Sequence, residues 1–223
     1  MDLRRPRRRL HPRLRAHRPD VPKHKGISVL IIPTDSPGLT RRPFGSFISP
    51  DDLDFNEVFF DDVELPLDAL IGDEGSGWAQ VTAELAFERS GPERIYSSWV
   101  LFEAWLEHLR ASGADDDAAA ALAGRILGHT ATLRAMSLAV TARLNAGASP
   151  VTEASLVKDL GTELEQFMPQ AIADALASAP GHQAPASLLR TLAYVTQFAP
   201  TFSLRGGTRE VLRGILARGL GLR

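Results

Sequence analysis

The chain has 223 residues, of which 44% are hydrophobic and 23% charged, and its formal net charge is −2. This length can bury a sizeable core and usually corresponds to one or two domains. No apolar run is long enough to span a membrane. The chain has no cysteine, which excludes a disulfide framework, a thiolate nucleophile and a Cys-ligated metal. The composition fits a reducing compartment, so we expect a cytoplasmic protein.

The N-terminal arm is strongly basic: residues 1–25 carry ten Lys and Arg residues against two acids, so the remaining chain is acidic. A nucleic-acid-binding arm would use these arginines to neutralise phosphates. An organellar targeting peptide should be amphipathic and serine-rich, but the arm contains four prolines and no serine before Ser28. The third interpretation is a leader without a role. We favour this last one and predict a disordered leader over residues 1–24.

Residues 25–74 predict a partial β-domain. The β-branched run 27–32 is a strand that ends at Pro33, residues 40–47 form a weaker strand interrupted by Pro43, and residues 55–63 form a third before Pro66. Two or three strands leave open edges. Their pairing partners should lie before residue 20, where only the basic arm is found.

From residue 75 onward the chain is rich in Ala, Leu, Glu and Arg at helical spacing. The pattern predicts helices over residues 78–89, 94–110, 118–145, 152–176, 185–198 and 208–217. In the third of these, one buried stripe is expected at Leu122, Ile126, His129, Leu133, Met136 and Val140. Short connections between long amphipathic helices favour antiparallel packing. We therefore expect a mainly α fold, with a bundle of four to five antiparallel helices over residues 75–223.

Two distant segments together resemble a known family. The first runs from Phe55-Asn-Glu-Val-Phe-Phe-Asp-Asp-Val-Glu-Leu-Pro66 through residues 71–78 to Phe87-Glu-Arg-Ser-Gly-Pro-Glu-Arg94, and the second is Leu204-Arg-Gly-Gly-Thr-Arg-Glu-Val-Leu-Arg213. They resemble the end of the middle β-domain and the C-terminal helical domain of flavin-dependent acyl-CoA dehydrogenases. Residues 87–94 are particularly similar to actinobacterial enzymes that act on bulky or steroid-derived acyl-CoA thioesters. The resemblance covers residues 22–223.

The resemblance implies FAD as cofactor, an acyl-CoA substrate, and assembly into a homo- or hetero-oligomer with a dehydrogenase subunit and an electron-transfer acceptor. In this family a carboxylate removes the α-proton of the thioester while the β-hydride passes to the flavin. Such a base needs a desolvated pocket, and the thioester oxygen needs hydrogen-bond donors. Nothing in the sequence indicates a membrane partner, and we disfavour a nucleic-acid partner.

Two positions can hold the base in this family. Many members carry it directly before the Gly-Thr of the last helix, where this chain has Gly206. Others carry it in a Glu-Arg pair on the first bundle helix, which Glu93-Arg94 matches. The resemblance thus implies Glu93 as the catalytic base and Arg94 as a substrate or helix partner. The alternative is an ordinary surface pair or structural bridge, of which Glu88-Arg89 is a second example.

The turn that opens the last helix is the second candidate site. Backbone N–H groups at a helix start, with a hydroxyl cap, suit an anionic or carbonyl ligand. The resemblance places this turn against the flavin, so the cofactor-binding candidates are Gly206, Gly207, Thr208 and Glu210. The alternative is a structural glycine turn with Thr208 as N-cap and with Val211, Leu212 and Ile215 buried. The six histidines are scattered without metal-ligand spacing, so no metal site is expected.

The sequence also departs from the family. The loop and strand that hold the flavin ring, and the N-terminal helical domain, have no counterpart, and residues 108–113 lack the Phe-Gly of an expected Arg-x-x-Phe-Gly motif. Two hypotheses follow. One is a truncated or split dehydrogenase acting with FAD on the CH–CH group of an acyl-CoA, inactive or weakly active alone. The other is a non-catalytic subunit or remnant that contributes a helical bundle to a dehydrogenase hetero-oligomer.

Overall fold

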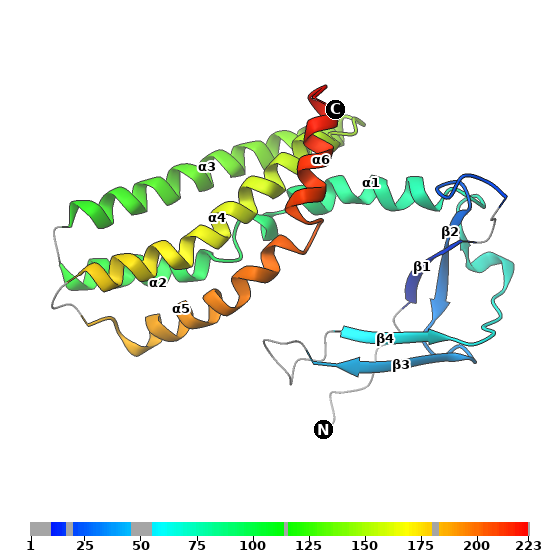
Figure 1. Ribbon diagram of the computed structural model, residues 1–223, viewed down its shortest axis with the longest axis horizontal. Helices are drawn as coiled ribbons and strands as arrows, with labels where there is room; N and C mark the ends of the chain where they lie inside the picture. The colour runs from blue at the N-terminus through cyan, green and yellow to red at the C-terminus, as the bar shows by residue number, and fades with distance from the viewer. Residues whose placement is uncertain (1–9, 17–19, 46–54, 114–115, 180–182, 223) are drawn as a thin grey trace. The chain divides into compact units, whose positions relative to one another are not determined.

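The computed structural model describes residues 10–16, 20–45, 55–113, 116–179 and 183–222 (Figure 1). The chain divides into two compact units, Met1–Ala83 and Glu84–Arg223, which meet within helix α1 (Gly77–Ser90). The sequence placed the start of the helical part at residue 75, slightly before this helix. None of the helices in the described ranges combines the length and the apolar character needed to cross a bilayer.

The first unit contains two small antiparallel sheets. One has three strands in the order β1-β2-β5, formed by Leu10–Ala16, Ile27–Pro33 and Leu70–Ile71. The other pairs β3 (Leu39–Phe44) with β4 (Phe55–Phe60). Strand β2 is central in its sheet and buries Val29 and Ile32. Strands β2, β3 and β4 match the three predicted β segments, although β4 ends at Phe60 instead of residue 63 and residues 46–47 of the second prediction lie outside the described residues.

Strand β1 corrects part of the prediction for the basic arm. Residues 10–16 were expected in a disordered leader, but they pair with β2 from Leu10 opposite Pro33 to Ala16 opposite Ile27. The pairing supplies the partner that β2 required before residue 20, because an open strand edge leaves backbone groups unsatisfied. Pro12 is compatible with this position, since β1 is an edge strand. The rest of the predicted leader, residues 1–9 and 17–19, lies outside the described residues.

A glycine-rich turn leads from β5 into α1. The Ser28 hydroxyl oxygen of β2 accepts a hydrogen bond from Gly75 N at 2.9 Å, and Gln80 Nε2 donates to Ile71 O at 2.7 Å. Gly77 begins the helix so close to β2 that an added Cβ would lie 2.8 Å from Ile27 O. Only glycine permits this approach of two backbones, which explains why glycines mark this transition in the sequence.

The second unit is a helical bundle. After α1 and a 3₁₀ turn at Pro92–Arg94 it contains α2 (Trp99–Ser112), α3 (Asp117–Asn145), α4 (Val151–Ser178), α5 (Ala186–Phe198), a 3₁₀ segment at Ala199–Ser203 and α6 (Arg209–Gly219). Helix α4 packs against α3 and α6, and α2 packs against α5 (Figure 1). The predicted mainly α fold with an antiparallel bundle is confirmed, and most helix ends lie within a few residues of the predicted ones.

Helix α2 starts later than expected. The sequence predicts a helix from residue 94, whereas residues 95–98 form turns and α2 begins at Trp99. The backbone N–H of Ser97 donates to the Glu165 carboxylate at 2.8 Å, and the Ser98 hydroxyl donates to Glu165 O at 2.9 Å. Glu165 of another helix, through its carboxylate and its backbone oxygen, therefore satisfies groups that would otherwise start the helix one turn earlier.

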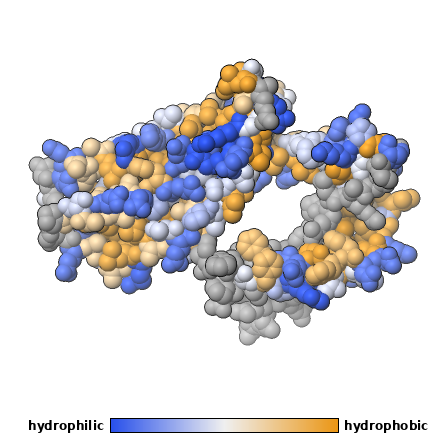
Figure 2. All heavy atoms as spheres, viewed as in Figure 1, coloured by the Kyte–Doolittle hydropathy of each residue, from blue (hydrophilic) through white to orange (hydrophobic). Residues whose placement is uncertain are grey.

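The core lies around α4. Its largest fully buried apolar side chains include Phe102 and Trp105 of α2, Ile126 of α3, and Met168 and Ile172 of α4. Figure 2 shows that hydrophobic side chains also remain visible over the bundle, among hydrophilic ones.

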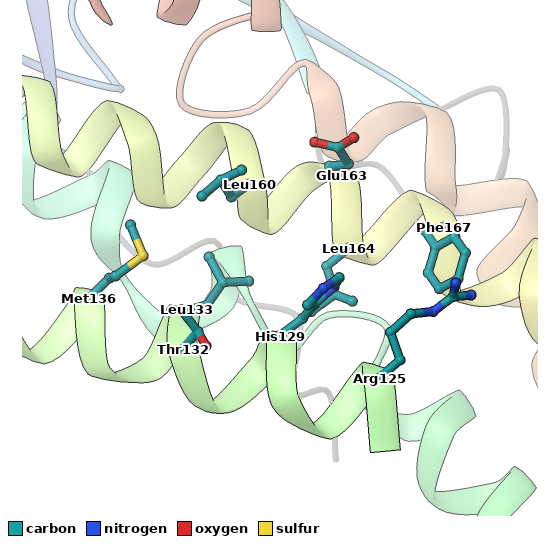
Figure 3. A pocket seen from close by; sticks show the side chains of 9 residues that line it. All are labelled: Arg125, His129, Thr132, Leu133, Met136, Leu160, Glu163, Leu164 and Phe167. Atoms are coloured by element: carbon teal, nitrogen blue, oxygen red, sulfur yellow. The ribbon is translucent and has the colours of Figure 1, made fainter. Parts of the chain in front are cut away.

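The predicted stripe on α3 is correct at Ile126, Leu133 and Val140, which are buried, while Leu122 and Met136 are partly buried against the core. The prediction is wrong at His129, which is exposed. His129 lies toward the rim of a groove between α3 and α4 instead (Figure 3).

We predict that Ile126→Ala lowers the free energy of unfolding by about 2–5 kcal/mol, because it removes a fully buried side chain and leaves a cavity. The matched control is Leu127→Ala, since the neighbouring Leu127 is 46% exposed; we expect a change of about 0.5 kcal/mol. Urea unfolding followed by circular dichroism measures both. Equal destabilisation by the two substitutions would contradict the packing of α3.

Candidate functional site

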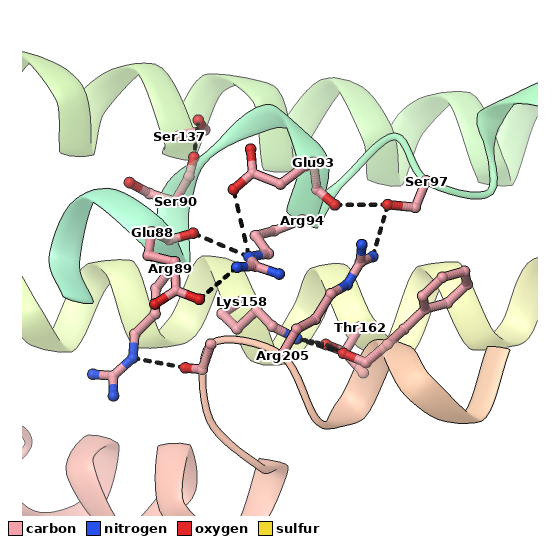
Figure 4. Close-up of polar contacts among 12 residues, drawn as sticks. Glu88, Arg89, Ser90, Glu93, Arg94, Ser97, Ser137, Lys158, Thr162 and Arg205 are labelled. Atoms are coloured by element: carbon pink, nitrogen blue, oxygen red, sulfur yellow. Dashed lines mark hydrogen bonds and ion pairs between the residues drawn. The ribbon is translucent and has the colours of Figure 1, made fainter. Parts of the chain in front are cut away.

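A cluster of polar side chains lies within the helical unit where the end of α1, the Pro92–Arg94 turn and α4 meet the turn before α6 (Figure 4). We refer to it as the glycine-turn cluster, and it consists of Glu88, Arg89, Glu93, Arg94, Ser97, Lys158, Thr162, Glu165, Arg205 and Gly206. The cluster contains the catalytic candidate, its arginine neighbour and the start of the glycine turn.

Arg89 ties the end of α1 to the glycine turn. Its Nε donates to Gly206 O at 2.9 Å, although the two residues are 117 positions apart in the chain. The side chain is buried, and its Nη1 lies 3.5 Å from the Ser155 hydroxyl oxygen. Burial lowers the pKa of the Arg89 guanidinium, and the charge of Glu88 partly opposes this shift. The two segments that carry the family resemblance are thus in direct contact.

Arg94 is the central cation beside Glu93. It is buried, its Nη2 donates to Glu88 Oε1 at 2.7 Å, and its Nε donates to Glu88 O at 3.1 Å. Glu93 Oε1 lies farther away, 3.6 Å from Arg94 Nε, and the Glu93 side chain is 52% exposed. The neighbours Glu88 and Arg89 therefore do not act as the simple pair suggested by the sequence, because Glu88 binds Arg94 and Arg89 binds the glycine turn.

The turn itself requires glycine. Gly206 and Gly207 have φ angles of 72° and 109°, a left-handed backbone that other residues adopt only with strain. An added Cβ at Gly206 would lie 3.4 Å from Lys158 Cε and 3.6 Å from Arg94 Cζ. The position where many family members carry their base is therefore bare in this chain, and two cations lie beside it.

Thr208 caps α6, as the structural interpretation of the turn required. Its hydroxyl oxygen accepts from Val211 N at 3.5 Å, and Leu212 is fully buried, whereas Val211 is 54% exposed and does not join the core. The Glu210 carboxylate forms hydrogen bonds with the backbone N–H of Glu210 and with the Thr208 side chain, and both bonds lower the pKa of this carboxyl. The side chains of Thr208 and Glu210 thus stabilise the first turn of α6 by hydrogen bonding.

Lys158 is a functional candidate that the sequence reasoning missed. It is fully buried in α4, and its Nζ donates to Phe202 O at 2.8 Å and to the Thr162 hydroxyl. Burial, followed by the charges of Arg94 and Arg205, lowers its pKa from 10.5 to about 8. A signal was present in the sequence, because Lys158 follows Ala154 by four positions on the buried face of the helix.

Glu165 is the buried anion that balances this cation-rich cluster. It is fully buried and accepts from Ser97 N and, at 2.9 Å, from Arg205 Nη2. Arg205 also donates to the Ser97 hydroxyl at 2.7 Å and stacks over the Phe202 ring at 4.6 Å. One carboxylate thus joins the segment before α2, the helix α4 and the turn that leads to Gly206.

A second ion-pair group fixes α6 on α4. Arg209 Nε lies 2.7 Å from Asp159 Oδ1, Arg209 Nη2 lies 3.3 Å from Glu163, and Arg213 Nε lies 3.5 Å from Asp159 Oδ2. The hydrogen bond to Asp159 raises the pKa of Arg209. The first half of helix α6 is therefore held on α4 by ion pairs.

The turn fits the requirements of a flavin in one respect. The backbone at Gly206 and Gly207 carries no side chain, and the atoms nearest to an added Cβ at Gly207 are Leu212 Cδ2 at 3.5 Å and Arg89 Nη2 at 3.7 Å. These side chains fill the space where a Cβ would lie, so a ligand at the start of α6 would contact the backbone N–H groups and not this side of the glycines. Among the described residues no group of three His, Asp or Glu side chains is arranged to hold a metal ion.

The amino-acid sequence of the chain is similar to those of known acyl-CoA dehydrogenases. No family model matches the chain. The acyl-CoA dehydrogenase FadE29 of Mycobacterium tuberculosis is 31% identical over 210 residues, which cover 89% of this chain and 52% of FadE29. The chain thus spans about half the length of the curated relatives that it matches.

Solved structures show the same fold. An acyl-CoA dehydrogenase from Geobacillus kaustophilus superposes with a TM-score of 0.77 at 24% identity, over 93% of this chain and 56% of that one. The ChsE4–ChsE5 complex from Mycobacterium tuberculosis superposes with a TM-score of 0.73 at 24% identity, over 96% of this chain and 57% of that one. The chain belongs to the acyl-CoA dehydrogenase family, whose middle-domain end and C-terminal helical domain it resembles.

Proposed function

We propose that this chain supplies the helical-bundle side of a flavin-dependent site that introduces an α,β double bond into an acyl-CoA thioester. The observation that carries the proposal is the hydrogen bond from Arg89 Nε to Gly206 O at 2.9 Å. It joins the end of the helix before Glu93 to the turn before α6. The similarity to FadE29 supports the reaction class, and the resemblance of residues 87–94 favours a bulky or steroid-like acyl group.

In this proposal Glu93 removes the α-proton of the thioester. Its carboxylate is half exposed, and its distance of 3.6 Å to Arg94 Nε is longer than a direct hydrogen bond, so it remains available to a ligand. A ligand that covers Glu93 would exclude water from the carboxylate, as general-base catalysis requires. Arg94 is the cation beside Glu93, with its Nε 3.6 Å from the carboxylate. A flavin bound at Gly206, Gly207, Thr208 and Glu210 would supply the acceptor for the β-hydride.

The second candidate is a non-catalytic subunit in a dehydrogenase hetero-oligomer. The absence of a side chain at Gly206 favours it, because the position directly before the Gly-Thr of the last helix carries no base on this chain. One structural neighbour, ChsE4–ChsE5, is itself a complex of two proteins. We propose a homo- or hetero-oligomer with a dehydrogenase subunit that completes the flavin site, and an electron-transfer acceptor as a further partner. The cysteine-free chain suits the cytoplasm.

We predict that Glu93→Gln lowers acyl-CoA dehydrogenation by the flavin-loaded protein or complex at least about 100-fold. Acyl-CoA binding should be retained, because the side chain keeps its size. The control is Glu107→Gln on the exposed face of α2, which should leave turnover unchanged. Flavin absorbance and turnover are measured together. Full turnover by Glu93→Gln would exclude Glu93 as the base, whereas a wild-type chain that remains colourless with every dehydrogenase partner would favour a role without flavin.

The position of the proposed site depends on Lys158, which holds Phe202 in the segment that leads to the glycine turn. The pKa of Lys158 is about 8 in the folded chain and 10.5 as the ordinary value. Below pH 8 the lysine is charged in both states, and burial of the charge weakens the folded state. Between pH 8 and 10.5 the unfolded chain binds more protons than the folded one, so the stability contributed by this group rises with pH.

We therefore predict that the free energy of unfolding of the wild type rises relative to that of Lys158→Met between pH 7.5 and 10.5. The relative gain should be about 3 kcal/mol for the full shift. Urea unfolding of both proteins at each pH gives the difference, in which the titration of groups that do not interact with Lys158 cancels. A difference that does not change with pH would show that Lys158 titrates in the folded chain as it does in water.

A further inference from the structure

Gly91 lies directly before the turn that carries Glu93, and its backbone does not require glycine. Its φ and ψ angles are −65° and 158°, an extended conformation that any residue can adopt. In this respect it differs from Gly206 and Gly207, which have a left-handed backbone. A glycine loses more conformational entropy on folding than any other residue. The reason for a glycine at this position is therefore steric and not conformational.

The space beside Gly91 is occupied by the carboxylate of Glu93. A Cβ added at Gly91 would lie 2.5 Å from Glu93 Oε1 and 2.7 Å from Glu93 Cδ, and its three nearest atoms all belong to this carboxyl group. Both distances are well below the separation of about 3.5 Å at which such atoms pack. Any side chain at position 91 would thus compete with the carboxylate for the same space.

The turn itself is fixed, so it does not make room for a side chain at position 91. Gly161 of α4 packs so closely on the turn that a Cβ added there would overlap Arg94 O. Arg94 is buried, Ile95 is 1% exposed, and Glu88 holds the Arg94 guanidinium at 2.7 Å. A side chain at position 91 would therefore displace the free end of the Glu93 side chain and leave the backbone in place.

This space matters because few contacts fix the Glu93 carboxylate. The side chain is flexible and 52% exposed, and its distance of 3.6 Å to Arg94 Nε is longer than a direct hydrogen bond (Figure 4). A general base, however, must be held within a fraction of an ångström of its working position. The bare backbone of Gly91 and the guanidinium of Arg94 together define one location for the carboxylate.

We propose that Gly91 is a positioning residue for Glu93, because its missing side chain leaves the space in which the carboxylate lies beside Arg94. This inference rests on the proposed role of Glu93 as the base. The contact between Gly91 and Glu93 depends neither on flavin nor on turnover, so it can be tested separately from that role.

The first test is a double-mutant cycle on the thermal stability of the full chain, which needs no flavin. In the Glu93→Ala background, Gly91→Ala should raise the unfolding midpoint by about 1–4 °C, because alanine suits this backbone and lowers the entropy of the unfolded chain. In the wild-type background the displaced carboxylate should cancel this gain. An equal rise of the midpoint in both backgrounds would overturn the proposal.

The second test is acyl-CoA turnover by the flavin-loaded protein or complex. Gly91→Ala should lower kcat about 10- to 100-fold and leave KM within about threefold, since it misplaces the base without removing a substrate contact. In the Glu93→Gln background the same substitution should have no further effect. The matched control is Gly124→Ala on α3, where an added Cβ meets no atom within 4 Å; this variant should keep full turnover.

The outcomes separate the two proposals. Full turnover by Gly91→Ala, or an equal loss in the wild-type and Glu93→Gln backgrounds, would reject the positioning role and leave Glu93 as the base. Full turnover by Glu93→Gln would reject the base itself and with it the positioning role. A positive stability cycle would in that case show that the contact between Gly91 and Glu93 is structural.

Discussion

Two charged side chains of α4, Lys158 and Glu165, are fully buried. Their hydrogen bonds fix the positions of the segment before α2 and of the turn before α6. A buried charge is costly unless hydrogen bonds and an opposite charge surround it. Lys158 meets this requirement through Thr162 and Phe202 O, and Glu165 meets it through Ser97 and Arg205. Except for the bond to Thr162, which lies within α4, each of these bonds reaches a segment outside the helix. The two charges are therefore satisfied only when the turn before α6 and the segment before α2 lie where they are seen.

This constraint connects packing with the proposed chemistry. The turn around Gly206 is fixed by bonds at Phe202, Arg205 and Gly206 itself, and the last comes from Arg89 of α1. Glu88 holds Arg94 at the same junction and leaves Glu93 at the longer distance. The arrangement separates a structural carboxylate from one that is open to a ligand, although both belong to the same short segment. The functional assignment of Glu93 depends on this division of roles.

Much of the fold could be predicted from the sequence, because hydrophobic spacing and glycine or proline breaks report local structure directly. The α3 stripe at Ile126, Leu133 and Val140 and the cap at Thr208 are examples. The failures share a different cause. Strand β1 and the delayed start of α2 depend on partners far away in the chain, and no local pattern shows where a partner lies. For Lys158 the spacing from Ala154 indicates the buried face, but nothing local indicates its partner Phe202. The exposure of His129 follows likewise from the position of α4 beside α3.

The left-handed backbone at Gly206 has a consequence for how such a chain can change over evolutionary time. A carboxylate at this position would be strained, because any side chain there would adopt a φ of 72°. The new acid would also lie beside Lys158 and Arg94, and these cations would keep it ionised and lower its pKa, which weakens it as a base. A base at this position of this chain would thus need a change in the backbone and a change in the surrounding cations.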